Sequence, residues 1–418
     1  MTGTDTLDIQ IPEESLQPIE PGLRGWAWVR RHLVSTWYNA ALTLVMALVI
    51  AVTLWWVVRF LFGTDFEILR VNLALMMVGG FPRDQLWRPA LALVLTAFLI
   101  GLIAGMATAS AAERSRWSGA EFEPAGPLTL VRRFWPVLVF IVAVLLLTQT
   151  LTPWLVVLAA LGAGALAYWT GRVIPSPVRR FGLVLVVLLL AGIYILLSGG
   201  GVGWGQWGGL QLNIFLTVAG IALAFPLGLL LALGRRSTLP ALRVASVTYI
   251  EFIRGVPLIT LLLMGIFVIG FFLPSGLRPG NVTRVLIAIT LFESAYIAEV
   301  VRGGLQSVPK GQVEAAQAVG LSPWKNMRLI VLPQALRNTI PAMVGQFISL
   351  FKDTTLVIIV GMIDILGASQ AANAQAPFLA QGLHLVTLPF VGFAFWVGSY
   401  TMSREARRLE RKLGVGER

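Results

Sequence analysis

The chain has 418 residues, of which 57% are hydrophobic and only 12% are charged, and its mean hydropathy is +0.80. Soluble domains carry about 25% charged residues, so this composition excludes an ordinary soluble domain. The formal net charge is +12, but the basic residues are scattered through short segments, which argues against a nucleic-acid-binding function. Cysteine is absent and only two histidines occur, which excludes disulfides and thiolate chemistry and predicts no metal site.

Residues 1–35 are predicted to form a cytoplasmic amino-terminal tail. The first 22 residues contain five acidic residues and no Lys or Arg, which is unlike the basic start of a signal peptide. The apolar segment that follows is long enough to stay in the membrane as a signal anchor.

Runs of about 20 apolar residues recur along the rest of the chain, as an apolar slab about 30 Å thick requires of a helix. A membrane barrel would show alternating polarity instead. The sequence therefore predicts an all-α integral membrane protein with about ten transmembrane helices. The predicted spans are 39–61, 89–111, 134–151, 154–171, 181–198, 213–233, 248–272, 285–302, 338–361 and 383–401. Because only Thr152-Pro153 separates the third and fourth spans, one broken helix is the alternative there.

The distribution of Lys and Arg predicts the orientation of these spans. If both termini are cytoplasmic, the inside segments hold 25 of the 32 basic residues and the outside segments hold five. Cytoplasmic loops of membrane proteins carry this excess. We therefore expect a multi-pass protein with both termini in the cytoplasm.

The chain changes character near residue 205. Residues 36–204 hold about five spans joined by short loops, and a glycine-rich segment then leads into residues 205–405, where charged residues occur beside the apolar spans. Residues 406–418 form a basic tail. The first part contains Gly101-Leu-Ile-Ala-Gly105, which either marks a close helix contact or arises by chance in apolar sequence. No internal repeat is evident, which gives no support to an inverted-repeat architecture.

The polar loop 303–337 is predicted to contain two short helices. Pro309 lies at the start of the first helix, and Gly320 supplies a left-handed residue that ends it. Ser322 then caps a second helix that has Pro323 at its first position. Trp324, Met327 and Val331 have the spacing of one helical face. The alternative is a loop that merely lies on the membrane surface.

The spacing of residues in this loop resembles the cytoplasmic signature of permease subunits of bacterial ABC importers, which reads E-A-A, three residues, G, nine residues, I-x-L-P. The corresponding residues are Glu314, Ala315, Ala316, Gly320, Ile330, Leu332 and Pro333.

Three flanking segments are similar to those of the polar amino-acid permeases. The segment Glu251–Leu258 resembles E-F-x-R-G-T-P-L, with Val256 in place of threonine, and the other two are Ser294–Gly304 and Ser349–Leu356. The resemblance covers about 205–405, roughly half of the chain. The long amino-terminal part is similar to that of broad-specificity L-amino-acid permeases.

This resemblance implies a type I ABC importer permease core of five helices, preceded by an amino-terminal helical extension. The loop 303–337 would be the coupling element that docks on two cytoplasmic ATPase subunits. A second permease subunit, identical or related, would complete the translocation path, and a periplasmic binding protein would deliver an amino acid. The substrates implied are L-amino acids in general, or glutamate, glutamine, aspartate and asparagine.

The sequence has no G-x-x-x-x-G-K-[ST] segment, so this chain is not expected to bind ATP by a P-loop. We expect no cofactor on this chain and no enzymatic activity of its own. The resemblance implies a complex in the bacterial inner membrane, in which the partner ATPase would hold ATP-Mg.

Several polar residues fall within or beside the predicted core spans. A charge at this depth is costly and usually faces a cavity or a partner. Candidates for the translocation path or its gate are Arg254, Glu293, Tyr296, Glu299, Lys352 and Asp353. The alternatives are structural: Glu299 can pair with Arg302 one turn away, and Pro257 can shape a helix start beside Arg254.

Two other classes of function remain open from the residues alone. One is an ion-coupled secondary transporter or channel that works without an ATPase. The other is a structural or sensory membrane protein that uses the loop as a signalling contact.

Overall fold

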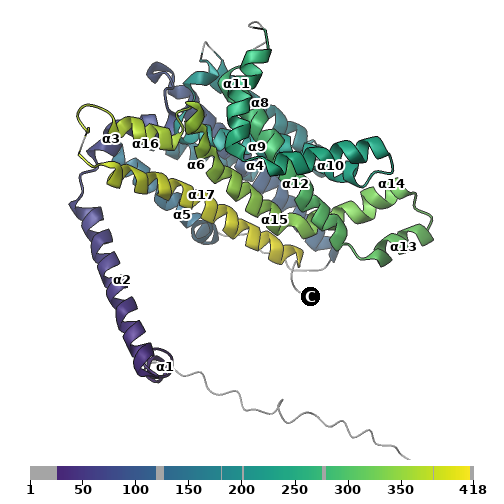
Figure 1. Ribbon diagram of the computed structural model, residues 1–418, viewed down its shortest axis with the longest axis horizontal. Helices are drawn as coiled ribbons and strands as arrows, with labels where there is room; N and C mark the ends of the chain where they lie inside the picture. Colours follow the sequence, from purple (N-terminus) through teal and green to yellow (C-terminus); the bar gives the residue numbers. More distant parts are fainter. Residues whose placement is uncertain are drawn as a thin grey trace, which may run out of the picture. The chain divides into compact units, whose positions relative to one another are not determined.

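The computed structural model describes residues 26–118, 127–179, 181–199, 202–274, 279–379 and 381–414. The described residues form helices and connecting turns, with no strand among them, as the sequence predicts. The chain divides into two compact units, Met1–Asp65 and Phe66–Arg418 (Figure 1).

The first unit contains α1 (Trp26–His32) and α2 (Trp37–Gly63). Thr36 caps α2, because its side chain accepts a hydrogen bond from the backbone N–H of Asn39 at 3.4 Å. With 27 residues and a rise of about 1.5 Å per residue, α2 is long enough to cross a bilayer. It confirms the predicted span 39–61.

The second unit holds all the other helices. They are α3 (Glu67–Val78), α4 (Trp87–Ser118), α5 (Pro127–Leu147), α6 (Thr152–Val173), α7 (Ser176–Arg179), α8 (Gly182–Ser198), α9 (Gly209–Arg235), α10 (Pro240–Gly255), α11 (Leu258–Phe272), α12 (Asn281–Ser307), α13 (Lys310–Ala318), α14 (Pro323–Asn326), α15 (Leu332–Asp353), α16 (Ile365–Asn373) and α17 (His384–Leu413). A π-helical turn, η5 (Met327–Val331), precedes α15, and a 3-10 helix, η6 (Thr354–Val360), follows it.

A helix or helix pair occupies each of the ten predicted span positions. Six of the described helices are long and apolar enough to cross a membrane, and a bent pair brings the number to seven. The alternative of one broken helix at 134–171 is wrong, since α5 and α6 are separate helices. They also have different neighbours, because α6 packs on α4 whereas α5 packs on α17.

The predicted span 248–272 is not one continuous helix. It is two helices, α10 and α11, that meet at an angle of 103°. The break lies at Val256-Pro257, where Val256 is extended, with φ −105° and ψ 130°. A residue before proline avoids the helical region, and proline lacks the N–H that would continue the helix. Pro257 therefore immediately precedes α11 as its N-cap residue, in agreement with the structural alternative for this segment.

Glycines let α4 and α6 pack backbone to backbone. A Cβ atom on Gly101 would overlap the carbonyl oxygen of Gly164, and one on Gly105 would overlap that of Tyr168. On the other side, a Cβ on Gly171 would lie 2.6 Å from the carbonyl oxygen of Leu102. The pattern Gly101…Gly105 is therefore a genuine packing face.

Gly101→Ala is expected to destabilise the folded protein by about 1–3 kcal/mol, because the added methyl group forces the two backbones apart. Gly162→Ala is the matched control, since a Cβ there meets nothing within 4 Å. Thermal unfolding of the purified protein in detergent measures both. Equal melting temperatures for the two variants would contradict this account of the contact.

The extension contacts the rest of the second unit at several places, and the sequence did not reveal two that involve polar side chains. At the first, α3 packs on α16 and α9, and Gln375 donates a hydrogen bond to the buried Asn72 at 2.6 Å. At the second, Arg133 on α5 forms a two-pronged ion pair with Glu405 on α17. Nearby, the ring of Trp135 lies 6.0 Å from that of Trp396. The boundary at 204/205 stays a prediction, but helices on its two sides pack together.

Candidate functional site

The loop between α12 and α15 forms the two short helices that the sequence predicts. Helix α13 starts after Pro309 and ends in a Schellman motif. Gly320 donates to the carbonyl of Gln317 at 2.9 Å, and Leu321 donates to that of Ala316 at 3.0 Å. Gly320 has φ +81°, so its left-handed conformation is confirmed. Glycine adopts this conformation without strain.

The second helix, α14, begins as predicted and is followed by a π-helical turn. Ser322 caps it by accepting from the backbone N–H of Lys325 at 3.4 Å, and Pro323 occupies the first turn. The chain then makes the π-helical turn η5, in which Leu332 donates to the carbonyl of Met327. Pro333 follows in the first turn of α15. Since proline cannot donate a backbone hydrogen bond, a change of helical register at this point is physically reasonable.

Side chains tie the two short helices to each other and to α15. The buried Asn326 on α14 donates to the carbonyl of Val313 on α13 at 3.2 Å. Gln334 on α15 donates to Gln312 at 3.4 Å. Asn338 on α15 donates to Ser307, at the end of α12, at 2.9 Å. These hydrogen bonds therefore connect the loop to the first turns of α15 and connect α15 to the end of α12.

The predicted coupling residues divide into outward and inward groups. Glu314, Ala315, Gly320 and Pro333 are exposed, and Ile330 and Leu332 are half-buried. Ala316 is 5% exposed, so its small side chain serves the packing of the loop itself. Of the two alanines, Ala315 is the one that an outside partner can approach.

The prediction that Trp324, Met327 and Val331 share one face is wrong. Trp324 is 66% exposed, whereas Val331 is 4% exposed. The π-helical turn between them adds residues to the turn and shifts the register of the face. The exposed apolar side chains of the loop are instead Val319, Trp324 and Leu329. Each of these three side chains is more than half exposed.

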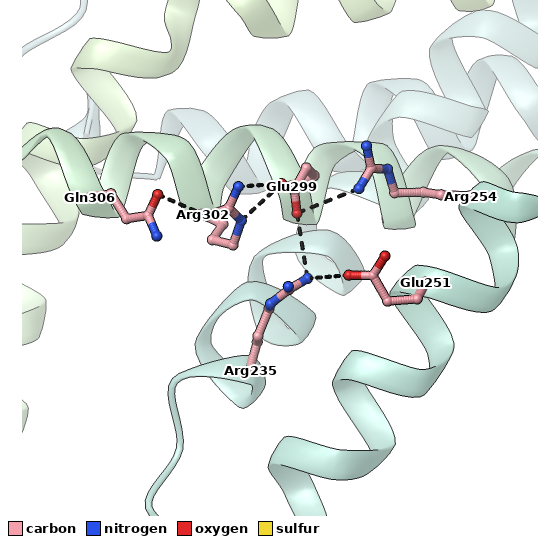
Figure 2. Close-up of polar contacts among 6 residues, drawn as sticks. All are labelled: Arg235, Glu251, Arg254, Glu299, Arg302 and Gln306. Atoms are coloured by element: carbon pink, nitrogen blue, oxygen red, sulfur yellow. Dashed lines mark hydrogen bonds and ion pairs between the residues drawn. The ribbon is translucent and has the colours of Figure 1, made fainter.

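Charged residues from three helices meet near the end of α12 (Figure 2). Glu299 lies at the centre and is paired with Arg302 one turn along α12, where the Nε–Oε1 distance is 2.9 Å. Its other oxygen faces Arg235 of α9 at 3.5 Å and Arg254 of α10 at 3.7 Å. The structural pairing of Glu299 with Arg302 is confirmed, and two further arginines join it. One carboxylate thus links α9, α10 and α12.

The outer members of this cluster extend the network. Arg235 also contacts Glu251 at 2.9 Å, and Arg302 donates to Gln306 at 2.8 Å. Arg254 lies over the ring of Tyr296, 5.6 Å from its centroid. Three guanidinium groups face two carboxylates here, so the cluster carries excess positive charge.

Glu299→Gln is expected to destabilise the protein by about 1–3 kcal/mol, because it removes the one carboxylate that three arginines share. Glu251→Gln is the matched control, because its side chain is 56% exposed against 23% for Glu299. An exposed ion pair contributes about 0–1 kcal/mol. The melting temperatures of both variants in detergent are compared with that of the parent protein. An equal loss of stability in the two variants would show that Glu299 is not the centre of the cluster.

Glu293 and Tyr296, which lie three residues apart on α12, have different neighbours. Glu293 is 1% exposed and accepts a hydrogen bond from Gln346 of α15 at 3.2 Å. Tyr296 packs on Phe292 instead, with ring centroids 4.7 Å apart. Glu293 therefore joins α12 to α15, while Tyr296 belongs with Arg254.

Lys352 and Asp353 end α15, and the exposed Lys352 lines an open groove between α15 and α17 with a volume of about 570 Å³. The other lining residues are Ile348, Gly392, Phe395, Trp396, Ser399, Tyr400, Ser403 and Arg407. Asp353 accepts from Ser349 at 3.5 Å. The lining of the groove combines two cationic side chains, Lys352 and Arg407, with aromatic rings and hydroxyl groups.

The sequence missed Gln346, Arg235 and Glu251 as partners of the predicted residues. A signal existed for Gln346, because it is a polar residue inside the predicted span 338–361. Arg235 and Glu251 lie 16 residues apart at the end of one helix and within another, and only the fold brings them together.

Known proteins are similar to this chain over most of its length. Residues 224–414 match the family described as binding-protein-dependent transport system inner membrane component. The inner membrane amino-acid ABC transporter permease protein YhdY of Escherichia coli (strain K12) is 34% identical over 409 residues, 94% of each chain.

Two further similarities cover half of the chain. The glutamate/glutamine/aspartate/asparagine transport system permease protein BztC of Rhodobacter capsulatus is 47% identical over 209 residues, which are 50% of this chain and 48% of that relative. The crystal structure of an amino acid ABC transporter with histidines contains a chain that is 28% identical, with a TM-score of 0.44, and the similarity covers 49% of this chain and 91% of that one. The extent of the similarity to YhdY and the family match together establish that this multi-pass chain belongs to the inner membrane components of binding-protein-dependent transport systems, among the amino-acid ABC transporter permeases.

Proposed function

We propose that this chain forms half of the translocation path of an ATP-driven amino-acid importer and that loop 303–337 couples it to separate ATPase subunits. The observation that carries the proposal is the rigid loop itself. The Schellman motif at Gly320 fixes the turn between α13 and α14, and Glu314 and Ala315 are exposed on this loop. A shape set by backbone hydrogen bonds suits an element that transmits movement.

The complex would contain a second permease subunit, two cytoplasmic ATPases that hold ATP-Mg, and a periplasmic binding protein. ATP hydrolysis belongs to the ATPase subunits, and the permease is not itself an enzyme. The relatives whose names specify glutamate, glutamine, aspartate and asparagine support these amino acids as substrates, with L-amino acids in general as the broader class.

The experiment is a reconstitution of the affinity-purified complex. Copurification of a P-loop ATPase and a second permease, and uptake of radiolabelled glutamate or glutamine that needs internal ATP, are the expected results. Uptake driven by a proton or sodium gradient without ATP would overturn the proposal in favour of a secondary transporter. Copurification without any transport would favour a sensory role.

The orientation with both termini in the cytoplasm is part of the proposal, because it places the loop on the ATPase side. A single cysteine introduced as Ser322→Cys is expected to react with a membrane-impermeant maleimide only after the cells are opened, since the native chain has no cysteine. A cysteine introduced as Gly205→Cys, in the connector before α9, should react in intact cells. The reverse pattern would place the loop outside and exclude coupling to a cytoplasmic ATPase.

A further inference from the structure

Helix α9 and the distant segment 354–364 meet at one buried polar cluster, which consists of Asn213, Thr354 and Asp364. Each of these residues is 0% exposed. The Asn213 side-chain amide donates to the Thr354 hydroxyl at 3.0 Å and to the Asp364 carboxylate at 3.1 Å. Its oxygen accepts from the backbone N–H of Ile365 at 3.1 Å. One side chain on α9 thus holds the start of η6 and the start of α16.

The hydrogen-bonding groups of the Asn213 side chain and both oxygens of the Asp364 carboxylate have partners. An amide side chain offers two N–H donors and one oxygen, and those of Asn213 all have partners. The Thr354 hydroxyl donates its own hydrogen bond to the carbonyl of Phe351 at 2.7 Å. The second oxygen of Asp364 accepts from the N–H of Gly367 at 2.8 Å and caps α16. A saturated buried network admits one arrangement, since any rotation leaves a polar group unpaired.

The backbone reinforces this arrangement. Gly209, at the start of α9, donates to the carbonyl of Ile363 at 2.8 Å. A Cβ on Gly208 would lie 2.5 Å from the same carbonyl oxygen. The start of α9 is therefore fixed against residues 363–364, and Asn213 is one turn further along that helix.

Thr354, a member of this cluster, directly follows Lys352 and Asp353 in the chain. Asp353 is the last residue of α15, and Thr354 is the first residue of the 3-10 helix η6. A 3-10 segment is a common ending of an α-helix, and the cluster fixes the residue at which this ending begins. The positions of Lys352, which lines the α15–α17 groove, and of Asp353 beside it depend on where α15 ends.

We infer that Asn213, Thr354 and Asp364 are positioning residues that fix the end of α15 and thereby hold Lys352 and Asp353 at the depth that transport requires. This inference rests on the proposed function for its consequence in transport. Its structural content can be tested without transport.

The test uses Thr354→Val, which removes the hydroxyl group that Asn213 holds and keeps the branched shape. Thr354→Ser is the rescue, because it keeps the hydroxyl group. Thr355→Val is the matched control, since the Thr355 hydroxyl donates to the Lys352 carbonyl at 2.8 Å within its own turn. The position of residue 352 is measured as the rate at which a permeant maleimide labels Lys352→Cys in the full-length chain. In the chain that keeps Lys352, uptake per ATP hydrolysed is measured as well.

With Thr354→Val, we expect the labelling rate to change by about tenfold. The loss of one buried hydrogen bond would shift the equilibrium between two positions of residue 352 by about this factor. Uptake per ATP should fall by a similar factor, and Thr354→Ser and Thr355→Val should behave like the parent chain. Unchanged labelling and uptake in Thr354→Val would overturn the inference. If that variant does not accumulate, Thr354→Ala takes its place under the same criterion. Absence of ATP-dependent uptake in the parent chain would refute the proposed function, while the labelling rates would still decide the positioning role.

Discussion

Replacing Gly320 with valine is expected to abolish ATP-driven uptake while the protein remains in the membrane at normal abundance. Gly320 has φ +81°, a conformation that costs an L-residue about 1–2 kcal/mol and a β-branched residue more. A Cβ at this position meets nothing within 4 Å, so the penalty is conformational and not steric. The chain would relieve it by giving up the two hydrogen bonds of the Schellman motif. Helix α13 would then lose its fixed angle to α14.

The measurements are copurification of the ATPase, substrate-stimulated ATP hydrolysis and uptake in proteoliposomes. Gly311→Val is the matched control, because Gly311 lies within α13, has no positive φ and likewise has open space around a Cβ. Gly320→Asn should restore much of the activity, since asparagine tolerates the left-handed conformation. Normal coupling in Gly320→Val would show that this loop is not the coupling element.

Ala315 and Ala316 refine this prediction. Both belong to the signature that implies the coupling loop, but only Ala315 is exposed. Ala315→Asp therefore tests the outside contact with the loop intact. Ala316→Asp buries a charge within the loop and is expected to act by unfolding it locally. Limited proteolysis of the loop separates the two effects.

The features that sequence reasoning predicted correctly depend on local chemistry. The left-handed Gly320, the Ser322 cap and Pro323 each follow from the preferences of one residue type at a helix end. The apolar segments follow from composition over about 20 residues. The Gly101…Gly105 contact lies between these cases, because the pattern was visible but its partner on α6 was not.

The features that were missed depend on the tertiary fold or on short elements. Helices α3 and α16 have 12 and 9 residues, too short to form a recognisable span. The links from Arg133 to Glu405 and from Asn213 to Asp364 join residues 272 and 151 positions apart. No periodicity in one sequence can reveal such pairs, since neither residue is unusual in its own helix. The break at Val256-Pro257 did have a local signal, the proline, but the apolar run around it favoured one span.

Lys352→Met is expected to reduce uptake by about tenfold or more with little change in the amount of folded protein. Lys352 falls inside the predicted span 338–361, yet its side chain is exposed on the α15–α17 groove. A charge in that setting is costly unless it meets water or an opposite charge, which a translocation path or its zwitterionic substrate would provide. Methionine keeps the length and apolar stem of lysine, so the packing around Phe395 and Trp396 should persist. A factor of ten corresponds to about 1.4 kcal/mol of lost interaction.

Lys412→Met controls for the loss of one positive charge, because Lys412 lies at the far end of α17, outside the predicted span. Lys352→Arg tests whether charge alone suffices or whether the compact ammonium group is needed. Asp353→Asn completes the set, since it removes the neighbouring negative charge and keeps a side chain that can accept the Ser349 hydrogen bond. Removing one partner of a purely structural buried pair would cost about 3–5 kcal/mol of stability. If uptake and folded protein fell together in Lys352→Met and Asp353→Asn, these residues would be structural, and the translocation path would have to be sought elsewhere in the chain.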